Sequence, residues 1–561
     1  MAVYWTDWIA CCPLRRLRIA LPIERFLADE GTSGLKSAHK PSQGFQDRDR
    51  RTPLTAEIEH RRSIDAWVMY DWANSAFFTT IQAAVLPTFF NAVAAANLSK
   101  VTASSYWGYT NTIGMLLMAL AAPVVGAIAD YSGSKKRFLA GFAIPGMIAT
   151  AALVLVGKGQ WQLASLLYIM GLIGVSGSLI FYDSLLPHVA RPDEIDMVSS
   201  RGYAIGYLGG GLLLAINIAW IMMPDLFGIT ALGAHFGATG AEMASRLSFL
   251  SVGIWWGVFS IPLFRHVKEP RYVRLQHDVA RNPVAGGFKR LVSTFQEIRL
   301  HRQLLIFLVA FWIYNDGIGT IIKMATIYGA EIGIGQIDLI GALLLTQFVG
   351  IPFSLMFGRL ARRGDPKQAF FLSFVAYNAV TLPMIGSIAP RLGITSGPIA
   401  VGLLVVNQIP AFLLSQFVGQ RALAGVARHI RTKHAILVGL IVYGMVSVWG
   451  YFMATAAEFW LLAVMVGLVQ GGSQALSRSL FGNMVPKART AEFFGFYDMS
   501  SKFAGILGPL LFAVVGQLAG SSRLSIVSLI VFFVVGGVIL TRLDEDEGIR
   551  VAREADARAS A

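Results

Sequence analysis

Three apolar segments of the sequence carry polar or ionisable side chains that could bind a solute or a proton. The candidates are Asp71, Asn74 and Gln82 in the first segment, Asn315, Asp316 and Lys323 in the second, and Gln470, Gln474 and Arg478 in the third. Asp71, Asn74 and Gln82 have the spacing of one helix face, as do Asp316 and Lys323 in the second segment and the three residues of the third. Because polar groups are costly in lipid, we expect these faces to line a polar path. Carboxylates and cations there would bind the two charged ends of an amino acid, and a carboxylate could carry a proton.

A second interpretation of the same side chains is that they only join helices by hydrogen bonds. For Asp316 and Lys323 we favour a functional role, because ionisable groups near the middle of a membrane are expensive. For Asn74, Gln470 and Gln474 both interpretations stay open. Asp71 lies one turn inside its segment and could instead belong to a gate. We expect Asp183 and Arg201, at the inner ends of two further segments, to form ion pairs of that gate.

The elements that position these residues follow from composition. Of the 561 residues, 55% are hydrophobic and only 14% are charged, which is too few to cover several soluble domains. A helix needs about 20 apolar residues to cross a bilayer. Fourteen segments qualify: 66–95, 106–129, 138–157, 162–187, 202–223, 245–264, 303–330, 337–361, 369–389, 398–420, 434–454, 459–480, 498–519 and 523–541. The sequence therefore predicts an all-α, polytopic membrane protein.

The charges of the loops predict the orientation of these segments. The chain carries a formal net charge of +14. The basic loops are 130–137, 265–302, 359–367, 421–433 and 481–497, and they alternate with loops of low positive charge. The positive-inside rule then places both termini in the cytoplasm, in a cell membrane of the bacterial inner-membrane type. The same pattern argues against a nucleic-acid partner, because the basic residues do not form one patch.

The second half of the sequence repeats the first. Pro187 and a later Gly206 to Gly209 pattern recur as Pro486 and Gly505 to Gly508, at one constant offset. Parallel repeats of six helices are typical of one large transporter architecture. We expect a basic, disordered tail over 1–63, a six-helix bundle over 64–264, a linker over 265–302, a second bundle over 303–541 and a tail over 542–561. The second bundle contains an inserted helix pair at about 369–420, without which the count would be twelve.

The loop after the second segment carries a motif with a physical role. Its residues are Gly126, Asp130, Gly133, Lys135, Lys136 and Arg137. Gly126 permits close helix contact, and Asp130 stands where a helix ends, so it can pair with an Arg or cap a neighbouring helix. An ordinary basic turn is the alternative. The motif resembles the signature of the major facilitator superfamily, although Tyr131 replaces a basic residue.

Two candidate copies of this motif occur in the second half. They are Gly425 to Arg428 and Gly358 to Gly364, and both lack the Asp. The sequence leaves open which copy faces the first half.

Further stretches narrow the resemblance. Residues 70–76 (YDWANSA), 471–481 (GGSQALSRSLF) and 491–509 (AEFFGFYDMSSKFAGILGP) resemble the vacuole-effluxer branch, which includes the autophagy-related vacuolar amino-acid effluxer and bacterial relatives. The resemblance implies a secondary transporter in which two six-helix bundles rock about a central site. It implies export of a small solute such as an amino acid. Proton coupling is a separate hypothesis that depends on the carboxylates of Asp316 and Asp71, and we expect no cofactor. We expect a monomer whose partners are the solute, H⁺ and the lipid bilayer.

Two functions of other classes remain as alternatives. A membrane receptor or scaffold that kept the fold would bind a protein partner through loop 265–302. A membrane acyltransferase would use the spacing of His188 and Asp193, in which an Asp orients a His as a base. No second catalytic block accompanies that pair, and the sequence shows no His and Cys cluster for a metal and no phosphate-binding loop. We therefore expect a protein that is not an enzyme.

Overall fold

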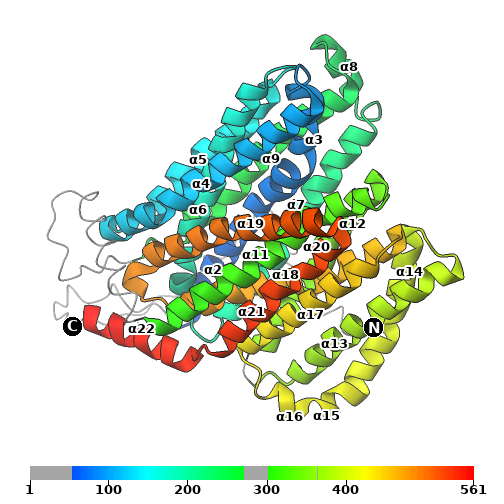
Figure 1. Ribbon diagram of the computed structural model, residues 1–561. Coiled ribbons are helices and arrows are strands. Elements are labelled where there is room, and N and C mark those ends of the chain that lie inside the picture. Colours follow the sequence, from blue (N-terminus) through cyan, green and yellow to red (C-terminus); the bar gives the residue numbers. More distant parts are fainter. Residues whose placement is uncertain (1–52, 271–300, 363, 561) are drawn as a thin grey trace, which may run out of the picture. The chain divides into compact units, whose positions relative to one another are not determined.

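The computed structural model describes residues 53–270, 301–362 and 364–560 (Figure 1). Most of the expected tail and linker therefore lies outside the described residues. Within the described ranges every regular element is a helix, and the described residues from Thr55 onward form one compact unit. Fourteen of these helical segments are long and apolar enough to cross a membrane, which confirms the predicted all-α fold and the number of spans.

The spans are built from helices with the following bounds. They are α2 (Pro53–Ala76) continued by η2 (Phe77–Ala84), α3 (Val85–Phe89) and η3 (Phe90–Ala94), α4 (Lys100–Ser132), α5 (Lys135–Ala152), α6 (Trp161–Val189), α7 (Ile195–Met222), α9 (Gly240–His266), α11 (Arg302–Glu331), α12 (Gln336–Ala361), α13 (Gln368–Ile388), α14 (Gly397–Leu414), α17 (Thr432–Phe452), α18 (Ala456–Met484), α19 (Thr490–Ala519), and α20 (Ser522–Ser528) with α21 (Ile530–Thr541). Shorter elements are η4 (Leu153–Leu155), α8 (Ile229–His235), η5 (Ala389–Leu392), η6 (Ser415–Gly419), α15 (Gln420–Ala422), α16 (Ala424–Ala427) and η7 (Lys487–Arg489), and α22 (Glu545–Ser560) is the last helix.

The first helix begins earlier than the hydropathy suggests. It starts at Pro53, so residues 53–63, which we expected in the tail, are helical. Proline is well tolerated in the first turn of a helix. Ion pairs then fix these polar turns to neighbouring segments: Glu57 lies 2.9 Å from Arg191, and Glu59 lies 3.0 Å from Lys268.

The two halves of the chain meet along two helix pairs. Helix α4 packs against α19, and α7 packs along α12. Gly126 in α4 lies directly against the carbonyl of Ala491, where a Cβ would clash. A Cβ on Gly358 in α12 would lie 2.6 Å from the Ser200 hydroxyl oxygen of α7. Gly425, by contrast, has open space around it. The copy of the motif that faces the first half is therefore the one that begins at Gly358.

The inserted helix pair, α13 and α14, lies beside α17 and α18 at the edge of the second half (Figure 1). Polar side chains join the two helices within an otherwise apolar pair. The Gln408 amide donates to Asn378 Oδ1 at 2.9 Å, and the Asn407 amide donates to the Thr381 hydroxyl at 3.0 Å. These bonds satisfy polar groups that would otherwise face lipid.

Helix α22 ties together helix ends of the second half. The backbone N–H of Lys433, in the first turn of α17, donates to Glu545 at 2.7 Å, and that of Lys487 donates to Asp556 at 2.7 Å. The first half repeats the former contact, since the N–H of Lys136 in the first turn of α5 donates to Glu269 at 3.1 Å. Burial raises the pKa of Glu545 to about 7 and also raises that of Glu269. We call the end of the helices that carries Lys135, Lys433 and Lys487 the basic end.

Candidate functional site

Arg478 stands at the centre of a buried ion cluster between the halves. Its guanidinium comes from α18, and only 2% of the residue is exposed. Nη2 lies 3.2 Å from Asp71 Oδ2 of α2, and Nη1 lies 3.1 Å from Asp183 Oδ1 of α6. Nε also donates to the Ser199 hydroxyl at 2.9 Å. Two of the candidates for the polar path, Asp71 and Arg478, are thus paired with each other and with a predicted gate residue.

Three aromatic rings surround the same guanidinium. Its central carbon lies 4.5 Å from the ring centre of Tyr203, 4.9 Å from Trp67 and 5.6 Å from Tyr182. Trp67 and Tyr182 stack on each other with ring centres 4.3 Å apart. The Tyr182 hydroxyl donates to Asp71 Oδ2 at 2.8 Å. Cation–π contacts in a desolvated place are each worth up to about 2 kcal/mol, so the rings add to the attraction of the carboxylates for Arg478.

Asp196, at the start of α7, makes a second set of bonds between the halves. It accepts hydrogen bonds from the Ser479 hydroxyl of α18 at 2.5 Å and from the Thr432 hydroxyl of α17 at 3.0 Å. The Ser199 hydroxyl donates to the Ala475 carbonyl at 2.7 Å. Ser199 thus bonds both to Arg478 and to the backbone of α18, and Asp196 lies one helical turn before Ser199 in α7.

The signature loop forms a third contact between the halves. Asp130 Oδ2 accepts the backbone N–H of Glu492 at 2.8 Å, in the first turn of α19, and Asp130 Oδ1 lies 3.0 Å from Lys135 Nζ. Lys135 also donates to the Thr490 hydroxyl. Of the two roles that the sequence left open for Asp130, capping a neighbouring helix is confirmed. The carboxylate also complements the positive end of the α19 dipole.

The other residues of the signature and gate sets have local roles. Gly133 ends α4 with a φ of 60°, a conformation that favours glycine. Lys136 Nζ donates to the carbonyls of Phe264 and Val267 at the end of α9, at 2.9 and 2.5 Å. Arg137 is exposed. Arg201 pairs with Asp65 at 2.7 Å on the surface and not with Asp183.

Asp316 lies apart from the Arg478 cluster, between α11 and α19. It is fully buried, and its Oδ1 accepts the backbone N–H of Gly508 at 2.9 Å. Its Oδ2 has no hydrogen-bond partner among the described residues. Lys323, two turns along α11, is exposed and lies within electrostatic range of Asp316 and of Lys502.

The remaining candidates are dispersed along the spans. The Asn74 amide donates to the Tyr70 carbonyl of its own helix at 2.7 Å, and the Asn315 amide donates weakly to Ser501 at 3.5 Å. Gln82, Gln470 and Gln474 are half-buried. For Asn74 the bond within its helix favours a structural role over solute binding.

Three acidic residues of the cluster share a signal that sequence reasoning missed. The dipeptide Tyr-Asp occurs in three different spans, ending at Asp71, Asp183 and Asp498. Asp498 lies within electrostatic range of Asp183 and pairs with Lys502 at 3.4 Å. Repetition of one dipeptide in separate spans could have grouped these residues before any coordinates were known. The sequence offered no comparable signal for Ser199 or Tyr203.

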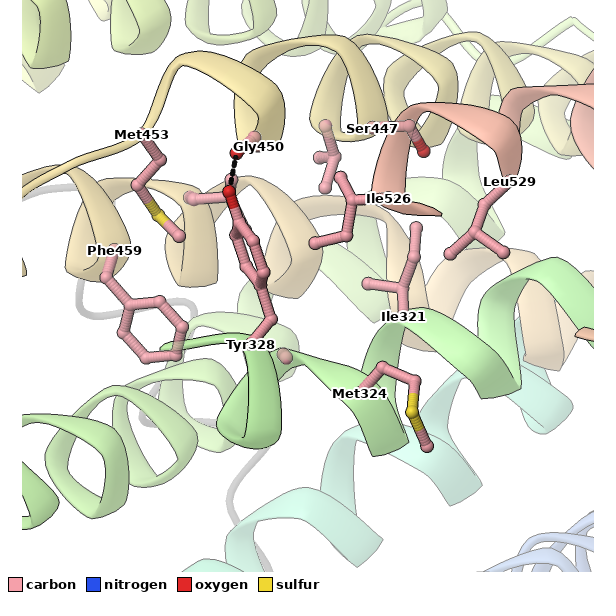
Figure 2. A pocket seen from close by; sticks show the side chains of 12 residues that line it. Ile321, Met324, Tyr328, Ser447, Gly450, Met453, Phe459, Ile526 and Leu529 are labelled. Carbon is pink, nitrogen blue, oxygen red and sulfur yellow. Dashed lines mark hydrogen bonds between the residues drawn. The ribbon is translucent and has the colours of Figure 1, made fainter. Parts of the chain in front are cut away.

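A small cavity within the second half is not a site for a polar solute. It is lined by α11, α17, α18 and α20 (Figure 2). Its lining is apolar apart from Ser447 and Tyr328, and the Tyr328 hydroxyl is already used, donating to the Gly450 carbonyl at 2.8 Å. The candidate groups Asp316 and Lys323 do not line it.

His188 and Asp193 do not form the pair that an acyltransferase would need. His188 Nε2 is buried against Lys135 Nζ and the Thr490 hydroxyl, each at 3.2 Å. Asp193 is exposed on the loop before α7. His188 is thus part of the signature contact between α6, α5 and α19.

Comparison with known proteins identifies the family of the chain. A family model described as vacuole effluxer Atg22 like matches residues 59–399 and 368–553. The uncharacterized MFS-type transporter YxiO of Bacillus subtilis is 36% identical over 491 residues, which cover 87% of this chain and 96% of the relative. Autophagy-related protein 22 of Saccharomyces cerevisiae is 23% identical and covers 81% of this chain and 80% of its own length.

Solved structures show the same fold at low identity. The human organic anion transporter MFSD10 matches with a TM-score of 0.53 at 11% identity, covering 86% of this chain and 99% of that chain. The proton:xylose symporter XylE matches with a TM-score of 0.53 at 13% identity, covering 87% and 96%. The chain therefore belongs to the vacuole effluxer Atg22-like family and is a transporter of the major facilitator type.

Proposed function

We propose that the protein exports a small polar solute of amino-acid type by alternating access, in exchange for protons. The basic end faces the cytoplasm in this proposal, in line with the loop charges. All hydrogen bonds and ion pairs between the halves described above lie on the basic-end side of the spans, so the described state is closed to the cytoplasm. Separation of the halves at that end would admit the solute.

The observation that carries proton coupling is the environment of Asp316. One carboxylate oxygen holds the Gly508 N–H, and the other has no partner among the described residues. A buried carboxylate with a free oxygen is suited to take up a proton when water reaches it and to keep it when water is excluded. Pro509 lacks an N–H, so α19 is weakened next to Gly508. Binding of a proton at Asp316 would therefore act on the helix that packs against α4.

Lys323 supplies the charge that the carboxylate end of an amino acid would need. It is exposed, and it has no ion-pair partner among the described residues. A solute carboxylate near Lys323 would lie about 10 Å from Asp316 along α11, since each residue adds about 1.5 Å. This separation is of the order of the length of a small amino-acid solute.

Transport by purified protein in liposomes tests this function. For wild type we expect amino-acid efflux that increases with an opposing proton gradient. Asp316→Asn should keep solute exchange and lose at least about 90% of the gradient-driven flux, because the proton no longer has a binding group. Asp225→Asn, at an exposed position, is the matched control. Wild-type flux that ignores the gradient, or an Asp316→Asn variant that still responds to it, would refute the coupling.

A further inference from the structure

The surface that holds Arg478 is built entirely by the first half of the chain. Trp67 and Asp71 come from α2, Tyr182 and Asp183 from α6, and Tyr203 from α7. We call these five residues the acid-aromatic cage. We propose that the cage binds the guanidinium or primary ammonium group of a cationic solute, and that Arg478 occupies it as a tethered substitute while the basic end is closed. This inference rests on the proposed function and names the class of solute.

The chemistry of the cage is that of a guanidinium receptor. One carboxylate receives each terminal nitrogen, at 3.2 and 3.1 Å, and aromatic faces cover the planar cation at 4.5 to 5.6 Å. Carboxylates with stacked aromatic rings are the groups that select guanidinium and alkylammonium ions. A free arginine side chain or agmatine presents the same cation as Arg478, whereas a lysine side chain presents a primary ammonium group.

Three of the five cage residues, Trp67, Asp71 and Tyr182, are held together by contacts that do not involve Arg478. Trp67 Nε1 donates to the Tyr182 carbonyl at 2.9 Å, and the Tyr182 hydroxyl fixes Asp71 at 2.8 Å. Ring stacking at 4.3 Å holds Trp67 on Tyr182. Since these bonds all lie within the first half, the cage would move as one body when the halves separate. A site that is already ordered binds its ligand without an ordering cost.

Opening at the basic end would withdraw Arg478 and leave the cage without its cation. Arg478 belongs to α18, whereas all five cage residues belong to the first half. Carboxylates that lose their cationic partner favour the binding of another cation in its place. A cationic solute from the cytoplasm would fill the place, and its departure would let Arg478 return and close the end. The cation of the solute and the guanidinium of Arg478 would then compete for the same cage.

The carboxylates around the cage are a separate observation that favours a cationic ligand. Three carboxylates, of Asp71, Asp183 and Asp498, meet two cations, Arg478 and Lys502. Asp498 Oδ2 is buried and has no hydrogen-bond partner among the described residues. Asp498 is thus a third carboxylate near the cage, with one oxygen that a cationic ligand could use.

Binding to the full-length Arg478→Ala protein tests the inference. We expect agmatine and arginine to bind at least tenfold more tightly to this variant than to wild type, because the internal competitor is gone. Citrulline, the neutral analogue of arginine, should not bind. Adding Asp183→Asn or Tyr203→Leu should weaken agmatine at least tenfold, whereas adding Glu554→Gln, on the exposed face of α22, should change nothing. Arg478→Gln serves as a second variant if the alanine protein does not fold.

Two outcomes of this experiment would overturn the cage. One is the absence of saturable agmatine binding to both Arg478 variants, and the other is equal binding of arginine and citrulline. Exchange of arginine and of leucine by the wild-type protein in liposomes distinguishes a failure of the cage proposal from a failure of the proposed transport function. Leucine exchange without arginine exchange or competition refutes the cage and leaves the transporter proposal standing. A failure of every amino acid to move refutes the proposed function, whatever the binding data show.

Discussion

Gly202 shows how a single residue makes room for the ion cluster. A Cβ at this position in α7 would meet Asp71 Oδ2 and would lie 2.9 Å from Arg478 Nη2 and 3.2 Å from the Trp67 ring. We predict that Gly202→Ala lowers the free energy of unfolding by about 1–3 kcal/mol, because overpacking displaces three fixed groups. Thermal unfolding in detergent measures this effect.

The control for this change is a glycine with empty space around it. Gly402 in α14 has nothing within 4 Å of an added Cβ. Alanine is the better helix former by up to about 1 kcal/mol, so Gly402→Ala should leave the unfolding temperature unchanged or raise it. Equal losses at Gly202 and Gly402 would show that the cluster tolerates displacement, contrary to our description.

At the residue scale, the sequence predicted which residues are polar and buried better than it predicted the residues that they contact. Helical spacing placed Asp71 and Arg478 on polar faces, and the cost of charge in lipid marked Asp316 as functional. Spacing gives the face of a helix but not the neighbour it meets. The contact of Arg478 with Asp71 joins residues 407 positions apart, so only the packed structure could reveal it.

At the scale of elements, the docking of α22 on the helix ends of the second half should depend on pH. Glu545 accepts the Lys433 N–H in a buried place near Asp196 and Arg431, and burial raises its pKa from 4.5 to about 7. An acid whose pKa is higher when docked favours docking most below about pH 4.5, and this contribution is lost as the pH rises through about 7. Docking of α22 should therefore weaken by about 1 kcal/mol between pH 6 and pH 8.

Hydrogen exchange of the α22 amides, corrected for the intrinsic pH effect, measures this change. We predict roughly fivefold to tenfold less protection at pH 8 than at pH 6 for wild type. Glu545→Gln keeps an oxygen for the Lys433 N–H but cannot ionise, so the protection near Glu545 should change less with pH than in wild type. Protection in wild type that rises with pH would contradict the assigned role of Glu545.

The membrane-spanning helices could be predicted from the sequence because the thickness of the bilayer sets their length. A membrane helix must satisfy its backbone and cover about 30 Å of hydrocarbon, which fixes an apolar run of about 20 residues. The polar turns of 53–63 carry no such signal, since they are held by contacts such as Glu57 with Arg191. The two motif copies at Gly358 and Gly425 likewise could not be ranked, because only packing on Ser200 distinguishes them.

At the scale of the whole molecule, the bonds between the halves are concentrated at one end. Arg478 with Asp71, Asp196 with Ser479, and Asp130 with the start of α19 all lie toward the basic end. Each bond joins one half to the other, so loss of several would release that end together. Removal of Arg478 should shift the population toward a state open there.

Distances between spin labels on the two halves test this claim most directly. In a Cys11→Ser/Cys12→Ser background, one pair of labels replaces Arg137 and His429 at the basic end, and a second pair replaces Leu155 and Leu392 at the opposite end, all exposed positions. We predict that Arg478→Ala lengthens the first distance and shortens the second, while Glu554→Gln changes neither. Two distances that stay fixed, or that lengthen together, would contradict a transporter whose halves rock about the site between them.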